Sequence, residues 1–168
     1  REATPEEIRK MQGIVREALE AGALGFAPSK AATHVGYQGK PVPSRAASFD
    51  EIAALAMEIK NVGRGGVIQA TVGRGLSFKE FAKLNEMSGA TVSWTALLAG
   101  IALNKGMTAH DQLERSSALI KEGYNVVPQV SPRALSFEYQ LKAPFVFEAM
   151  RMFKPVSEAD FEGKKRLY

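Results

Sequence analysis

Gly65–Gly75, GGVIQATVGRG, is the stretch that decides the predicted fold. Its centre, Val67–Val72, is a short apolar run with many β-branched residues and glycines on both sides, which is typical of a buried strand. A helix is predicted directly after it, because Ser77 suits a cap position and Glu80 stands three residues further on. Strand, glycine turn and helix in this order form the βα unit of a parallel sheet.

The same unit recurs on both sides of this stretch. The other predicted strands are Ala23–Ala27, Ala90–Leu97 and Asn125–Val130. The predicted helices run from Thr4 to Gly22, from Ser48 to about Gly63, from Ser77 to about Met87 and from Thr108 to Gly123. Strands that alternate with helices of this length favour parallel βαβ units with right-handed crossovers. Two architectures fit this pattern, an open doubly wound sheet and half of a β/α barrel.

The composition is that of a soluble globular protein. The chain has 168 residues, an apolar fraction of 45% and a charged fraction of 24%, enough for one domain with a core. Its net charge of +4 is scattered, with a short basic run only at Lys164–Arg166, so we expect no nucleic-acid partner. No apolar run approaches the roughly 20 residues of a membrane span, so we expect no membrane partner. The absence of cysteine excludes disulfides and thiolate chemistry, and we expect a reducing, cytoplasmic location.

Three segments have no regular assignment. Pro28–Ala47 is rich in glycine, proline and serine, and loops of this length are usually functional or disordered. Leu98–Met107 is apolar but contains two glycines, and its pattern favours neither helix nor strand. The tail, Pro132–Tyr168, carries many large apolar side chains, which we expect to cover a barrel end or a partner chain.

Candidate functional residues are sought at the carboxyl ends of the predicted strands, where parallel α/β sheets bind their ligands. These positions hold Ser29, Lys30, Gln69, Thr71, Trp94, Thr95, Gln129, Ser131 and Arg133. None is an obvious general base, and the sequence indicates no histidine partner for any of the hydroxyls. His34, in the long loop, is expected either to contact a substrate or to pack the loop. His110 is expected to be a solvated first-turn residue, and the two histidines do not form a zinc site by spacing.

Gly73-Arg74-Gly75 follows a strand and precedes a helix, the place where phosphates bind in related folds. It lacks the third glycine of the dinucleotide fingerprint and the Lys-Ser/Thr of a P-loop. A plain βα turn is therefore the favoured interpretation.

Several segments resemble the N-acyl-D-amino-acid deacylases, or D-aminoacylases, of the amidohydrolase superfamily. They are Arg16–Phe26 (REALEAGALGF), the His34 loop with Gly39–Ser44 (GKPVPS), Ala47–Glu51 (ASFDE), Ser93–Leu98 (SWTALL), Pro128–Ser131 (PQVS) and Leu135–Phe137 (LSF). The resemblance implies a partial TIM-type β/α barrel, in which residues 1–168 are a single α/β domain and a fragment of a larger metal-dependent-hydrolase-like barrel. For the whole protein it implies hydrolysis of amide bonds with one or two zinc ions.

The chain departs from that family where metal ligands are expected. The family's fifth and sixth strands usually end in metal-binding histidines, but this chain has Ala70–Val72 at the first and Trp94 after Ser93 at the second. No histidine lies between His34 and His110, so a shift of register does not supply the ligands. We therefore expect no metal site within the chain and no activity of this fragment alone; zinc in the full-length parent would take its ligands from elsewhere.

Two hypotheses about function remain. The first is an amidohydrolase-like enzyme for a small N-acyl amino acid or related amide, with His34, Arg74, Gln129, Ser131 and Arg133 as substrate-binding residues. In it, Arg74, Arg133 or Arg45 would receive the substrate carboxylate as a bidentate pair. The second is a non-catalytic half-barrel that binds a ligand or a partner. Both leave two open sheet edges, so we expect a homo-oligomer or pairing with the missing barrel half.

Overall fold

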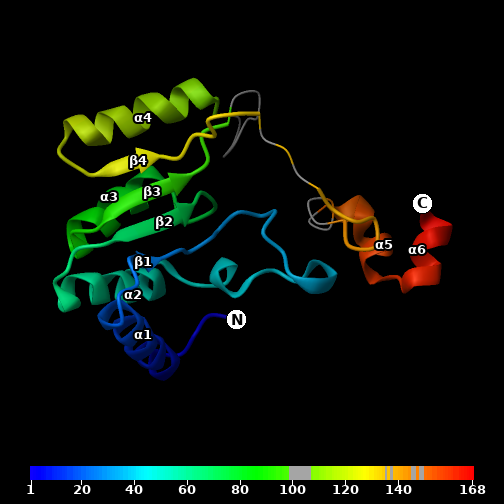
Figure 1. The fold of residues 1–168 in the computed structure, drawn as a ribbon, viewed down its shortest axis with the longest axis horizontal. Helices are drawn as coiled ribbons and strands as arrows, with labels where there is room; N and C mark the ends of the chain where they lie inside the picture. Colours follow the sequence, from blue (N-terminus) through cyan, green and yellow to red (C-terminus); the bar gives the residue numbers. More distant parts are fainter. Residues whose placement is uncertain (99–106, 135, 137, 145–146, 148–149) are drawn as a thin grey trace.

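The computed structural model describes residues 1–98, 107–134, 136, 138–144, 147 and 150–168. Within these residues, four parallel strands form one sheet in the order β1-β2-β3-β4 (Figure 1). The strands are β1 (Gly25–Phe26), β2 (Val67–Thr71), β3 (Thr91–Thr95) and β4 (Val126–Pro128). Most of the unassigned segment Leu98–Met107 lies outside the described residues.

The predicted helices all form. They are α1 (Pro5–Glu20), α2 (Phe49–Val62), α3 (Phe78–Ser88) and α4 (Ala109–Lys121). The first and last begin with complete capping boxes, in which the N-cap threonine and the acidic residue three positions later exchange hydrogen bonds. At the start of α3, the Ser77 backbone N–H and hydroxyl both donate to Glu80 at 3.0 Å. α2 and α3 end where Gly63 and Gly89 take the left-handed conformation, with φ of 74° and 69°.

The strand order decides between the two architectures that the sequence left open. Each strand pairs with its neighbour in sequence, and consecutive helices contact one another from α1 to α4. A doubly wound sheet reverses direction and carries helices on both faces. Here the winding continues in one direction, as in a TIM-type barrel, so the chain forms a partial barrel of consecutive βα units.

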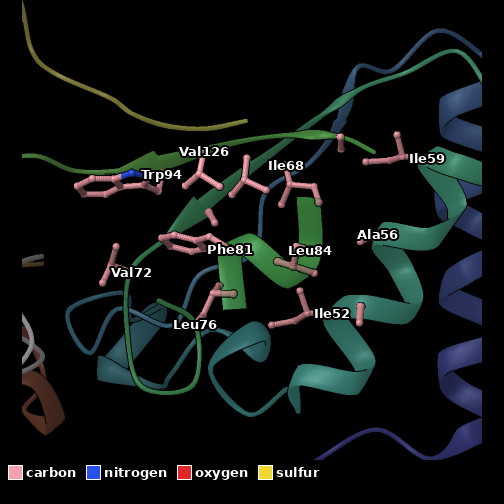
Figure 2. Packing of buried hydrophobic residues seen from close by; sticks show 14 of the residues in the cluster. Ile52, Ala56, Ile59, Ile68, Val72, Leu76, Phe81, Leu84, Trp94 and Val126 are labelled. Carbon is pink, nitrogen blue, oxygen red and sulfur yellow. The ribbon is translucent and has the colours of Figure 1, made fainter. Parts of the chain in front are cut away.

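The core lies between the sheet and its helices. Alternate strand residues, among them Ile68, Trp94 and Val126, are buried in this core (Figure 2). Because successive strand residues point to opposite faces, the residues between them face the other side of the sheet. Trp94, which is fully buried, packs edge-on against Phe78 at 5.3 Å and is stacked with Phe81 at 6.4 Å between ring centroids. Its indole N–H donates to the Ser116 hydroxyl at 3.2 Å, which in turn donates to the Val126 carbonyl at 3.0 Å. This chain of contacts fixes β3, β4 and α4 together.

A buried ion pair joins α1 to α2. The Glu58 side chain is 1% exposed and lies on the helix–helix contact. Arg16 Nε donates to Glu58 Oε2 at 2.8 Å, and Arg16 Nη2 also lies 2.8 Å from the same oxygen. Gln12 Nε2 donates to Glu58 Oε1 at 2.9 Å. Both carboxylate oxygens are therefore satisfied, as a buried charge requires.

The first strand is shorter than the predicted Ala23–Ala27. Pro28 has no N–H, so regular pairing stops after Phe26, but the backbone stays beside β2. Its Pro28 carbonyl accepts from Thr71 N–H at 3.0 Å, and an isolated bridge joins Ser29 to Thr71. β3 and β4 are also shorter than predicted. The predicted strands continued through Ala96–Leu97 and Gln129–Val130, which lie beyond the regular pairing of β3 and β4.

The tail folds into short helices that lie apart from the sheet in Figure 1: η3 (Arg151–Phe153), α5 (Lys154–Glu158) and α6 (Phe161–Leu167). Phe147 stacks on Phe153 at 4.9 Å, and α5 contacts η1 (Tyr37–Gly39) in the long loop. Phe137 and Phe145, two of the large apolar residues of the tail, lie outside the described residues. Across the described part of the chain, no helix combines the length and the apolarity needed to cross a membrane.

Candidate functional site

The long loop after β1 is fastened to the end of that strand by a cluster of small polar side chains. The Ser44 hydroxyl donates to the Ser29 carbonyl at 2.9 Å and accepts from Ser29 N–H at 3.2 Å. A hydrogen bond of 2.6 Å joins Ser29 Oγ to His34 Nδ1. The loop therefore has a defined path at the carboxyl edge of the sheet, where a ligand is expected in this fold.

The Ser29–His34 pair corrects one sequence-based prediction. The sequence indicated no histidine partner for the strand-end hydroxyls, and for Ser29 this is wrong. The pairing was not visible because the two residues meet only when the loop turns back, with His34 N–H donating to the Ala31 carbonyl at 3.1 Å. Ser29 is 8% exposed and no described carboxylate bonds to His34, so the pair orients the imidazole rather than forming a catalytic triad.

A cavity of about 820 Å³ opens beside this loop. It lies between residues 30–33, residues 45–49 and the β2–α3 turn at residues 72–75. Three cations, Lys30, Arg45 and Arg74, line it, against one acid, Glu2. The surplus of positive charge and the hydrogen-bonding capacity of the guanidinium groups suit a carboxylate or another small anion.

Two of the three cations are held in place by backbone carbonyls. Lys30 Nζ donates to the Arg45 carbonyl at 3.1 Å and also to the Ala47 carbonyl. Burial lowers the pKa of Lys30, and the negative charges of Glu51 and Glu2 act in the opposite direction. Arg45 Nη1 donates to the His34 carbonyl at 3.3 Å, while Arg74 is exposed on its turn.

The cavity wall where the β2–α3 turn meets the chain after β1 depends on Gly73. A Cβ atom at this position would lie 2.0 Å from the Lys30 carbonyl oxygen and 2.2 Å from its carbon. Only glycine allows the β2–α3 turn to approach the backbone of Lys30 this closely. The sequence contained the signal, a glycine directly after the strand, but the partner of the close approach is not visible in the sequence.

A second polar group lies on the face of the sheet that the helices do not cover. Gln69 of β2, Thr95 of β3 and Gln129, just after β4, form a continuous hydrogen-bonded row across three strands. Gln69 Nε2 donates to Thr95 Oγ1, and the Thr95 hydroxyl donates to Gln129 Oε1 at 2.9 Å. All three were identified from the sequence as strand-end residues, but their contact follows from the register of the sheet.

The structure thus separates the five predicted substrate-binding residues. Arg74 lines the cavity, His34 is bonded to the cavity residue Arg45, and Gln129 belongs to the row on the sheet. Ser131 and Arg133 are exposed beyond β4, where the Ser131 hydroxyl donates to the Arg133 carbonyl at 2.6 Å. Neither of these last two lines the cavity. Their role in substrate binding stays a prediction.

The zinc that the family resemblance implies has no fitting set of ligands among the described residues. No group of three or more His, Cys, Asp or Glu side chains is placed there to hold a metal ion. His34 uses Nδ1 for Ser29, and His110 is exposed on α4 beside Glu114 at 3.3 Å. Four-coordinate or three-coordinate protein sites need more donors than these residues offer together.

The fold and these strand-end groups define a partial β/α barrel of the TIM type. A solved structure of a D-aminoacylase mutant in complex with copper chloride superposes on the chain with a TM-score of 0.58 at 20% sequence identity. The match covers 79% of this chain and 26% of that chain, so this chain spans about a quarter of the D-aminoacylase. The resemblance to an internal segment of such a barrel is therefore confirmed at the level of the fold. No protein-family description and no curated protein sequence matches the chain.

Proposed function

We propose that the chain is the central arc of an amidohydrolase-like barrel, in a protein that hydrolyses the amide C–N bond of N-acyl amino acids in the manner of a D-aminoacylase. The observation that carries the proposal is the superposition on D-aminoacylase, which extends over most of this chain. Any metal ion would be held by residues outside this chain and would supply an activated water there. We also propose a cytoplasmic location, as expected from the cysteine-free sequence.

The cavity contributes the recognition of the substrate carboxylate. An N-acyl amino acid carries one carboxylate and one amide, and Arg74, exposed on its turn at the edge of the cavity, can bind the carboxylate through two parallel hydrogen bonds. Lys30, which also lines the cavity, adds positive charge to this site. Ser29 bonds to His34 Nδ1, which leaves Nε2 of His34 for a ligand or water.

The test uses the natural polypeptide that carries this chain. It is assayed for release of free amino acid from N-acetyl-D-leucine and N-acetyl-L-leucine, and the absence of release from both would refute the proposal. Arg74→Gln is expected to raise KM for the cleaved enantiomer about 10-fold or more, the typical worth of a charge-assisted hydrogen bond. The same variant leaves binding of the uncharged N-acetylleucinamide unchanged. Lys79→Gln, an equal change of charge at an exposed position of α3, is the matched control.

A non-catalytic binding module is the second candidate. It is favoured by the row of carboxamide and hydroxyl groups at the strand ends, which can bind a ligand but have no group suited to acid–base chemistry near neutral pH. Stoichiometric binding of an N-acyl amino acid without turnover would select it. For both candidates we propose a homo-oligomer or pairing with the rest of a barrel, since β1 and β4 form open edges in the described sheet.

A further inference from the structure

The Gln69–Thr95–Gln129 row has a direction, set by which group donates in each of its two hydrogen bonds. A hydroxyl has one proton and two acceptor lone pairs, so Thr95 can donate to only one of the two carboxamides. In the structure, Thr95 accepts from Gln69 Nε2 and donates to Gln129 Oε1. Among the described residues, Gln69 Oε1 and Gln129 Nε2 have no hydrogen-bond partner. The row therefore presents an acceptor on one side of Thr95 and a donor on the other.

The direction of the row depends on how the two amides are oriented, but reversing both of them still leaves one acceptor and one donor outward. Exchanging oxygen and nitrogen in both glutamines reverses the row, with Gln129 donating to Thr95 and Thr95 donating to Gln69. The outward groups are then a donor on Gln69 and an acceptor on Gln129. Exchange in Gln69 alone would place two acceptors on a hydroxyl that has one proton. Exchange in Gln129 alone would place two donors on it and leave the Thr95 proton without a partner in the row. The two states in which Thr95 accepts once and donates once within the row both leave one end that accepts and one end that donates.

The backbone around the row is fixed by the sheet. Gln69 lies within β2, opposite Ser93 of β3. Gln129 N–H donates to the Trp94 carbonyl at 2.8 Å, and the Gln129 carbonyl accepts from Leu97 N–H at 3.1 Å. The two glutamine side chains therefore start from rigid positions on either side of Thr95. Such preorganisation lowers the entropic cost of binding a ligand.

We infer that this row binds the secondary amide of a ligand that lies across β3 on the open face of the sheet. A secondary amide has one N–H and one carbonyl, which point in opposite directions, and these match the outward acceptor and donor of the row. The row carries no net charge, so it suits a neutral group rather than a carboxylate. The inference rests on the proposed function for the identity of the ligand, an N-acyl amino acid whose carboxylate is bound elsewhere.

The test compares N-acetyl-D-leucine with the ester that has oxygen in place of the amide N–H. Binding to the natural polypeptide is measured by ligand-observed NMR before turnover accumulates. We expect the amide to bind about fivefold more tightly than the ester, as one neutral hydrogen bond allows. Thr95→Val, which removes the hydroxyl but keeps the shape, is expected to abolish this preference, and Thr95→Ser to retain it.

Thr91→Val is the matched control, because Thr91 lies on the same strand and accepts from Asn125 Nδ2 at 2.7 Å but is not part of the row. It is expected to keep the amide preference. Equal binding of amide and ester by the unaltered protein, or a preference that survives in Thr95→Val, would overturn the inference. Hydrolysis is measured separately. If the protein hydrolyses the substrate but binds amide and ester equally, only this inference is refuted. If it prefers the amide but does not hydrolyse it, only the proposed catalytic function is refuted.

Discussion

Replacing Arg16 by methionine tests whether the buried Glu58 is as dependent on its partner as the structure indicates. Without Arg16, Glu58 keeps only the neutral Gln12 among its described partners, while its side chain stays 1% exposed. Breaking a buried pair from one side typically costs 3–5 kcal/mol. Because the Arg16 side chain is 52% exposed, water reaches the gap, and we expect a loss near the lower end, about 3 kcal/mol.

Urea unfolding followed by Trp94 fluorescence measures this loss, since Trp94 is the single tryptophan of the sequence and is fully buried. The double variant Arg16→Met, Glu58→Met is the control, because it removes both charges and keeps apolar volume between α1 and α2. We expect it to unfold within about 1 kcal/mol of the unaltered chain. A loss below about 1 kcal/mol in Arg16→Met, or an equal loss in the double variant, would refute the reasoning.

Two further predictions concern the cavity wall and the first helix. Gly73→Ala is expected to lower the free energy of unfolding in urea by about 3 kcal/mol or more, because its Cβ would overlap the Lys30 backbone. Gly75→Ala is the control and is expected to cost about 1 kcal/mol, because Gly75 has a φ of 77° but open space around it. Equal costs for the two variants would contradict the close approach. The hydrogen bond from Arg1 lowers the pKa of Glu7 from its ordinary 4.5 to about 2, so the stability that Glu7 adds above pH 4.5 is lost as the pH falls through 2. An NMR titration of the Glu7 carboxyl checks this midpoint, which Arg1→Gln should raise, and a midpoint near 4.5 in the unaltered chain would contradict the pairing.

Local signals in the sequence were sufficient for the helices and for the existence of the strands. Caps such as Thr4 and Thr108 satisfy backbone groups within one turn, so they act before any tertiary contact forms. The sequence contains the signal that ends β1, the missing N–H of Pro28, but not the bridge beyond it, which depends on the Pro28 carbonyl meeting Thr71. Strand ends are set by pairing between segments that are far apart in the sequence.

In the candidate site, too, residue positions follow from the sequence, whereas contacts between distant segments do not. The position of Arg74 after β2 follows from the chain order, and the structure places it in a cavity. The contacts of His34 with Ser29 and of Thr95 with the two glutamines depend on loop closure and on sheet register. No spacing rule in a single sequence encodes them, so the sequence identified the residues but not their partners.

The neighbour-to-neighbour strand order has a consequence for how the chain assembles during synthesis. Each strand pairs with the strand made just before it, so no strand of the described sheet has to wait for a distant part of the chain or pass through a closed loop. Each pairing joins strands that are consecutive along the chain, so it closes a loop of only one βα unit. The sheet can therefore grow from β1 to β4 as the ribosome delivers it, with the last strand formed serving each time as the template for the next.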